Sequence, residues 1–357
     1  MNADRRRLTF GFDRFSGLYL WAVFIIAFGI IEPHTFLTSG TVDSVASSQA
    51  VAAMLGVALV IPLAAGVYDL SIGATANLAA IVAVYLQTSR GWPILPSIVV
   101  SVLAGVVIGA VNGFVTVKLK VNSFIVTLGM ATIIGAVQSI VSGDNQPLPP
   151  TSTFWSGLTQ HTIGGIQIIF IYLLVIAVIV WWALDHTPAG RYLHAIGGNQ
   201  NAARLSGVRV GKWMWLSLIA SGGISALAGV FFSSLSGPSL TFGPELLLPA
   251  FAAAFLGSTQ LKPGRFNVWG TVLAVYILQT GVRGMELWTS VGWLNDMFNG
   301  VALIAAVSFA VWRQGKVRTR AKTISPGADA EPAPPAGPSP DLDGRAALSE
   351  ENPVQRL

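Results

Sequence analysis

Few residues of this chain could carry acid–base chemistry within an apolar environment. The 357 residues include 16 acidic residues, four histidines and no cysteine. The acidic residues next to the long apolar runs all lie near the ends of those runs: Asp69, Glu245, Glu286 and Asp296. A proton-coupled transporter usually carries its proton on a carboxylate or histidine inside the membrane. This distribution argues against proton coupling, whereas sodium coupling through backbone carbonyls stays open.

Motifs for energy-transducing or hydrolytic chemistry are absent from the sequence. The glycine cluster at residues 257–264 lacks the G-x-x-x-x-G-K-[ST] spacing, and neither H-E-x-x-H nor G-x-S-x-G occurs. The histidines are scattered, which favours solvated loop residues over ligands: His34, His161, His186 and His194. Without cysteine, thiolate metal sites are excluded. We therefore expect no enzymatic activity, no metal and no cofactor, so any power source would be another polypeptide.

Composition places the chain among membrane proteins. Hydrophobic residues make up 53% of the chain and charged residues only 10%, against a typical soluble share of about 25% charged. The mean hydropathy is +0.64. The net charge of +5 is small for this length and comes from loop residues, so it does not indicate nucleic-acid binding.

A window of about 20 residues predicts an all-α polytopic membrane protein with about ten transmembrane helices. The predicted spans are residues 17–31, 44–66, 70–87, 94–117, 123–142, 166–184, 213–235, 246–258, 267–282 and 291–312. The eighth is too short to cross as a simple helix, so we expect it to be broken or partly re-entrant.

The distribution of basic residues predicts that both termini are cytoplasmic. With this topology only Arg90 and Arg283 of the 21 basic residues lie outside, which leaves 19 inside. Residues 1–16 then form a cytoplasmic N-terminus and residues 17–312 the membrane domain. Residues 313–357 form a tail whose composition changes after Lys322 to Pro, Ala, Gly, Ser and acidic residues, and we expect this cytoplasmic tail to be disordered.

A polar, basic segment at residues 190–212 separates two long apolar runs. Asn199 is a good helix N-cap, residues 200–205 are strong helix formers, and Gly207 stands where a glycine ends a helix. We expect a short helix that another protein touches. An ordinary basic cytoplasmic loop is the alternative.

Small and polar residues within the runs indicate how the helices pack. Gly105, Gly109 and Gly113 recur every four residues, which predicts close helix packing. Asn112 and Gln138 either line a path or form interhelical hydrogen bonds. Asp69 either caps the third helix at the inner membrane boundary or contacts a substrate.

Tryptophans flank the predicted outer boundaries, as aromatic belts do. These residues are Trp92, Trp155, Trp288 and Trp293.

Three segments resemble the permeases of bacterial ABC importers of the ribose/xylose/galactose type. Residues 197–207, GGNQNAARLSG, are similar to the family's cytoplasmic signature G-G-N-x-x-A-A-R-x-S-G. Residues 66–73, GVYDLSIG, resemble its G-x-D-L-S-x-G segment with one extra residue, and residues 112–129 resemble its N-G-x…F-I-x-T-L-G segment. The resemblance covers residues 45–312. It departs from the family at Asn201, where an acidic residue is usual, and at Ser258, where a second glycine is usual.

The resemblance implies a type II-like ABC importer permease in the bacterial inner membrane, which translocates a monosaccharide or related polyol. Its partners would be a cytoplasmic ATP-binding subunit, a periplasmic sugar-binding protein on residues 143–165 and 236–245, and a second permease copy. The residues implied in coupling to the ATPase are Gly198, Asn199, Asn201, Ala202, Ala203, Arg204, Leu205, Ser206 and Gly207. Candidate path residues are Asp69, Asn112 and Gln138. The alternatives are an ion-coupled secondary transporter or facilitator, or a related importer of branched-chain amino acids or nucleosides.

Overall fold

The computed structural model describes residues 12–289, 291–294 and 297–308, with side chains from residue 17 onward. The predictions for residues 1–11 and for the tail from residue 313 therefore lie outside the described residues. The described part is helical apart from one two-stranded hairpin and the connecting segments.

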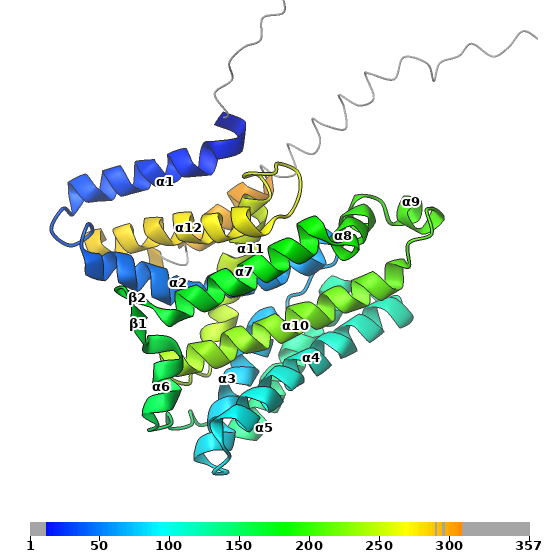
Figure 1. The fold of residues 1–357 in the computed structure, drawn as a ribbon, viewed down its shortest axis with the longest axis horizontal. Helices are drawn as coiled ribbons and strands as arrows, with labels where there is room; N and C mark the ends of the chain where they lie inside the picture. Colours follow the sequence, from blue (N-terminus) through cyan, green and yellow to red (C-terminus); the bar gives the residue numbers. More distant parts are fainter. Residues whose placement is uncertain (1–11, 290, 295–296, 309–357) are drawn as a thin grey trace, which may run out of the picture. The chain divides into compact units, whose positions relative to one another are not determined.

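Seven long helices form the body of the bundle. They are α1 (Phe12–Ile31), α2 (Ser39–Ala64), α4 (Ile94–Lys118), α5 (Ser123–Ser142), α7 (Ile168–His186), α10 (Val210–Leu235) and α12 (Val268–Thr289). Five described helices, namely α2, α4, α5, α7 and α10, are long and apolar enough to cross a membrane. In Figure 1, α4, α7, α10 and α12 run along the same direction.

Shorter elements complete the bundle and occupy its two ends. They are α3 (Ile72–Thr88), α6 (Thr153–Gln160), β1 (Thr162–Ile163), β2 (Ile166–Gln167), α8 (Pro188–Gly198), α9 (Gln200–Leu205) and α11 (Phe242–Gly257). A further apolar helix spans Met297–Ser308. The helices α8 and α9 lie at one end of the long helices, and α6 with the antiparallel hairpin lies at the other (Figure 1). Each of the ten predicted spans overlaps a helix, so the polytopic helical class holds.

Helix α2 forms the centre of the described core. Its residues 50–64 are buried on every side, because α7, α10, α11 and α12 pack around it. A helix that is apolar all round belongs in such a position. The neighbouring helices therefore reach lipid with only one of their faces.

The glycines of α4 allow the close helix packing that their spacing predicted, and the structure shows that the partner helix is α10. A Cβ atom added at Gly105 would lie 2.4 Å from the Gly222 carbonyl oxygen, and one at Gly109 would lie 2.3 Å from the Leu218 carbonyl oxygen. Gly229 plays the same role toward α3, since its Cβ would lie 1.9 Å from the Ala76 carbonyl oxygen. Backbone-to-backbone contact at these positions holds the helices by dispersion.

Several sequence-based expectations need correction. The eighth span is not broken: α11 starts at Phe242 and continues through Pro249, although at 16 residues it stays shorter than the helices that are long enough to cross a membrane. The ninth continues to Thr289. Trp155 is not a belt residue, because it is 2% exposed and its α6 side chain joins a buried cluster with Val230 of α10.

The other three tryptophans are exposed, as a belt requires. Trp92, Trp288 and Trp293 are 45%, 59% and 62% exposed.

We predict that Gly109→Ala destabilises the protein, because the added methyl group collides with the α10 backbone. Overpacking of this kind costs about 1–3 kcal/mol. Thermal unfolding of the detergent-purified chain would measure the loss. Gly129→Ala on α5 is the control, because nothing lies within 4 Å of its Cβ position. Equal melting temperatures for the two variants would contradict this account of α4 and α10.

Candidate functional site

The short helix α9 has defined caps at both ends. The Asn199 side chain accepts a hydrogen bond from the Ala202 N–H at 3.0 Å. At the other end Gly207 adopts φ +82°, and its N–H donates to the Arg204 carbonyl at 3.0 Å. The Val208 N–H donates to the Ala203 carbonyl at 3.0 Å, which completes a Schellman motif. This helix and its limits agree with the sequence-based prediction.

Helix α9 projects its side chains away from the bundle. Leu205 is 90% exposed, and Arg204 in the same turn is also exposed. Ala203 is buried and anchors the helix to the chain below. Capping fixes the backbone, so α9 presents an apolar side chain and a cation on a rigid support. Such a protrusion can fit a groove in another protein.

Helix α8, which the sequence analysis did not predict, fastens this protrusion to the bundle. A Cβ atom at Gly190 would meet the Leu184 carbonyl oxygen at 1.8 Å, so α8 lies directly on the end of α7. A Cβ atom at Gly197 would meet the Ala64 carbonyl oxygen at 2.3 Å, at the end of α2. Pro188 at the first helical position was the sequence signal for α8.

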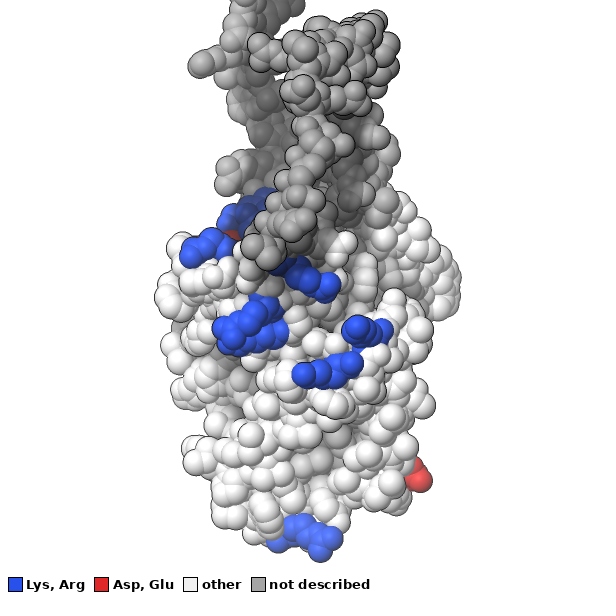
Figure 2. Space-filling view, turned by 90° about the vertical axis from the view of Figure 1, so that its right-hand side faces the viewer, with Lys and Arg blue, Asp and Glu red and all other residues white. Residues whose placement is uncertain are grey.

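Basic side chains cover the end of the bundle that carries α8 and α9, as Figure 2 shows. The exposed basic residues at the end of α4, in and next to α8 and α9, and between α11 and α12 are Lys118, Lys120, Arg191, Arg204, Arg209, Lys212, Lys262 and Arg265. Lys262 binds Asp185 at the end of α7, with 2.6 Å between Nζ and Oδ2. Burial, followed by the charge of Arg265, lowers the pKa of His194 to about 4. This histidine is therefore neutral at pH 7 and adds no charge to the basic end.

The segment between α2 and α3 enters the bundle and carries the buried Asp69. Its carboxylate accepts hydrogen bonds from the Ser71 N–H at 3.1 Å, from the Ser71 hydroxyl at 2.6 Å and from the Ser221 hydroxyl at 2.8 Å. Asp69 is 1% exposed. Ser221 lies midway along α10, so Asp69 is inside the bundle. The expected position at the inner membrane boundary was wrong.

Asp69 also does not act as the N-cap of α3. Ser71 precedes the helix, and its side chain makes no capping bond. Asp69 instead closes a turn by bonding the Ser71 N–H two residues on. The sequence argument against proton coupling assumed that no carboxylate lies inside the membrane domain. Because the Asp69 carboxylate is buried within the bundle, that argument no longer holds.

Two further helices bind the same segment. The Asn112 amide of α4 donates to the Ser71 hydroxyl at 2.9 Å. On α5, the Ser123 hydroxyl accepts from the Tyr68 N–H at 3.1 Å, and the Thr127 hydroxyl accepts from the Leu70 N–H at 3.0 Å. The structure thus brings Asp69 and Asn112 into one hydrogen-bonded network.

The N-termini of α3 and α11 meet beyond this network. Cβ atoms at Gly73 and Gly243 would each lie within 2.3 Å of the other residue's carbonyl oxygen. The Asn77 side chain of α3 accepts from the Gly243 N–H at 3.0 Å, so it caps α11 from another helix. Leu70 precedes Gly73 in the chain and bonds Thr127 near the start of α5. Asn77 follows Gly73 and bonds Gln138 near the end of α5. The junction therefore lies at mid-length of the bundle.

Gln138 belongs to this junction rather than to the Asp69 network. Its Nε2 donates to the Leu240 carbonyl at 3.0 Å, and the Asn77 amide donates to the same carbonyl at 2.8 Å. Asn77 was not among the predicted site residues, although an amide within an apolar run is a signal that could have identified it. These bonds hold Leu240 and Gly243 against α3 and α5, whereas Thr241 between them is exposed.

The sequence of this chain is similar to those of known transport proteins. The chain matches the family described as branched-chain amino acid transport system / permease component over residues 41–307. It is 31% identical to the L-arabinose transport system permease protein AraH of Escherichia coli over 335 residues, which cover 89% of this chain and 97% of that protein. It is 30% identical to the ribose import permease protein RbsC of Bacillus subtilis, with 82% and 90% covered. The D-allose transport system permease protein AlsC of Escherichia coli is 27% identical, with 83% and 91% covered.

The chain belongs to this family of transport-system permease components. It is a multi-pass membrane protein and a non-catalytic subunit, which agrees with the absence of ATP-hydrolysing motifs from its sequence.

We predict that Asp69→Ala is strongly destabilising, because it leaves the Ser71 and Ser221 donors without their acceptor. Hydrogen bonds to charged groups contribute about 1.5–3 kcal/mol each. Ser221→Ala removes only one of them and should lower the melting temperature less. Thermal unfolding in detergent would rank the variants. A melting temperature for Asp69→Ala at or above that of Ser221→Ala would show that the carboxylate does not hold this segment.

Proposed function

We propose that this chain is the inner-membrane permease of an ATP-driven importer for a monosaccharide or a related polyol. The cargo class is supported by the similarity of the chain to permeases for arabinose, ribose and allose. In this arrangement the chain has ten spans with both termini in the cytoplasm. The predominance of basic residues at the α8–α9 end supports this orientation.

The observation that carries the proposal is the rigid, exposed helix α9. We propose that a cytoplasmic ATP-binding subunit holds α9 in a groove, with Leu205 as the apolar anchor and Arg204 as the polar contact. Residues 198–207 supply the whole contact. An ordinary loop would require neither the Asn199 cap nor the Schellman motif at Gly207.

We further propose that movement of α9 reaches the centre of the bundle through α8. Gly197 at the end of α8 lies against Ala64, and its Cβ position is 3.3 Å from the Gly66 nitrogen. Gly66 begins the segment that carries Asp69 and leads into α3. A shift of α8 would therefore displace the start of α3 and its contact with α11.

The translocation path then passes beside the α3–α11 junction, between this chain and a second permease copy. Asp69, Asn112 and Gln138 are each less than 10% exposed and bonded to neighbouring helices. We propose that they act on the path by holding α3 in place. A periplasmic sugar-binding protein would dock on the opposite end at residues 143–165 and 236–245, which include α6, strand β1 and the start of α11.

We predict that Leu205→Ala weakens binding of the ATP-binding subunit by about 5- to 30-fold, because truncation of an interface anchor costs about 1–2 kcal/mol. Copurification and reconstituted ATP-dependent uptake would measure it. Leu95→Ala is the control, since Leu95 is 70% exposed at the opposite end of α4. Uptake by this chain alone, driven by an ion gradient, would instead support a secondary transporter.

We predict that Gly197→Ala uncouples ATP hydrolysis from uptake, because the methyl group separates α8 from Ala64. The complex with the ATP-binding subunit should still form, since α9 is unchanged. Gly135→Ala on α5 is the control, because nothing lies within 4 Å of its Cβ position and it lies outside the proposed contact. Equal ratios of sugar transported to ATP hydrolysed in the two variants would exclude the proposed route.

A further inference from the structure

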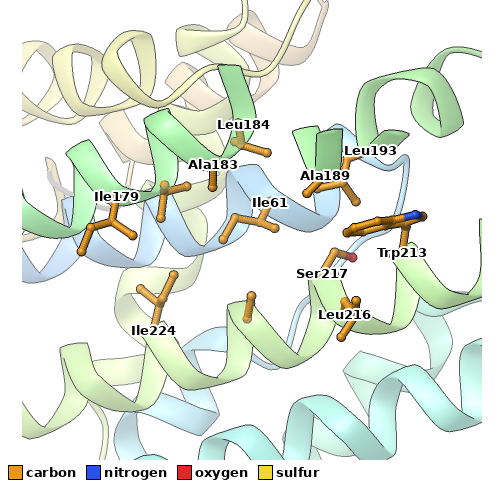
Figure 3. Close-up of a pocket in the computed structure, with 12 residues that line it drawn as sticks. Ile61, Ile179, Ala183, Leu184, Ala189, Leu193, Trp213, Leu216, Ser217 and Ile224 are labelled. Atoms are coloured by element: carbon orange, nitrogen blue, oxygen red, sulfur yellow. The ribbon is translucent and has the colours of Figure 1, made fainter. Parts of the chain in front are cut away.

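A cavity of about 290 Å³ opens between α2, α7, α8 and α10 near the basic end of the bundle. Figure 3 shows the side chains of α7 and α10 facing one another across it, with α2 behind and α8 and Trp213 at one end. Its walls include Ile61, Ile179, Leu193, Leu216 and Ile224. The volume is close to the lower limit for ligand sites in proteins.

The lining excludes a sugar as the ligand of this cavity. Ser217 is the only lining residue with a hydroxyl, and its oxygen donates to the Met214 carbonyl at 2.7 Å. A polyol needs several hydrogen-bonding partners, and burying its hydroxyls without them costs several kcal/mol. The cavity therefore suits a hydrocarbon chain.

The sides of the cavity face the lipid. Ile179 on α7 is 59% exposed and Leu216 on α10 is 41% exposed, so the wedge between these helices opens on the membrane side. An acyl chain could enter laterally without crossing a polar surface.

Aromatic and basic side chains stand at the α8 end of the cavity. The Tyr192 and Trp213 rings lie 5.3 Å apart, and the Lys212 Nζ is 5.7 Å from the Trp213 ring centroid. Arg191 is exposed on α8, between the lining residues Ala189 and Leu193. Asp185 follows the lining residue Leu184, but its carboxylate is bound by Lys262. The charge at this end is therefore positive.

We propose that this cavity binds one acyl chain of an anionic phospholipid from the leaflet at the basic end, with the headgroup phosphate held by Lys212 and Arg191. Aromatic residues at headgroup level and basic pockets between helices are features of such lipid sites. The bound lipid fills the wedge between α7 and α10 and supports α8. The site requires only that the chain is embedded in a membrane, so it does not depend on the cargo or on ATP coupling.

Native mass spectrometry of the full-length chain in detergent tests this site, with phosphatidylglycerol and phosphatidylcholine of identical acyl chains as probes. One tightly bound phosphatidylglycerol per chain is expected. Lys212→Gln should weaken phosphatidylglycerol binding about fivefold and leave phosphatidylcholine unchanged, since each basic residue near the headgroup contributes about that factor. This surface substitution does not alter the core.

Ala183→Phe fills the cavity and should abolish the tight lipid, whereas Val175→Phe should not. Val175 is on the same helix, 51% exposed and outside the cavity lining. Undiminished lipid binding by Ala183→Phe, or equal affinity of the wild-type chain for the two lipids, would overturn the proposal. Loss of a chain dimer with retention of bound lipid in Ala183→Phe would assign the cavity to a second copy instead.

Discussion

The structure depends on how the backbone of residues 65–71 is satisfied inside the bundle. A membrane offers no water to unpaired N–H and C=O groups, so an irregular segment within it must find its partners on neighbouring helices. Ser123 and Thr127 of α5 accept two of its N–H groups, and Asp69 accepts a third. Asp69 in turn bonds Ser221 of α10. These bonds fix where α3 begins and therefore which residues it presents to α11.

The same segment joins the two places where function is proposed. At its first residues it lies against Gly197 of α8, and at its end it leads to the contact of Gly73 with Gly243. Both contacts are between backbones, with no flexible side chain between them. A displacement at the basic end can therefore reach the middle of the bundle through few atoms, as an ATP-driven gate requires.

The surface of the bundle divides by chemistry along its length. The long helices expose apolar side chains, which is stable only against lipid or another apolar protein surface. At the α8–α9 end these give way to cations, to the Tyr192–Trp213 pair and to the protruding Leu205. Lipid headgroups can bind at the rim of this end while a protein partner binds at α9, because the lipid and the protein contact different side chains.

The membrane class, the approximate helices, the close packing at the α4 glycines and the capped helix α9 could be predicted from the sequence. These depend on composition, spacing and local turn chemistry, which act within a few residues. Hydropathy could not tell the central helix from a peripheral one: α2 and α5 are about equally apolar, yet 72% and 11% of their apolar windows are buried. Only the tertiary structure decided the burial of Asp69 and Trp155, the docking of α8 and the pairing of Asn77 with α11. Each of these depends on partners distant in the chain, and apolarity suits lipid and protein neighbours equally well.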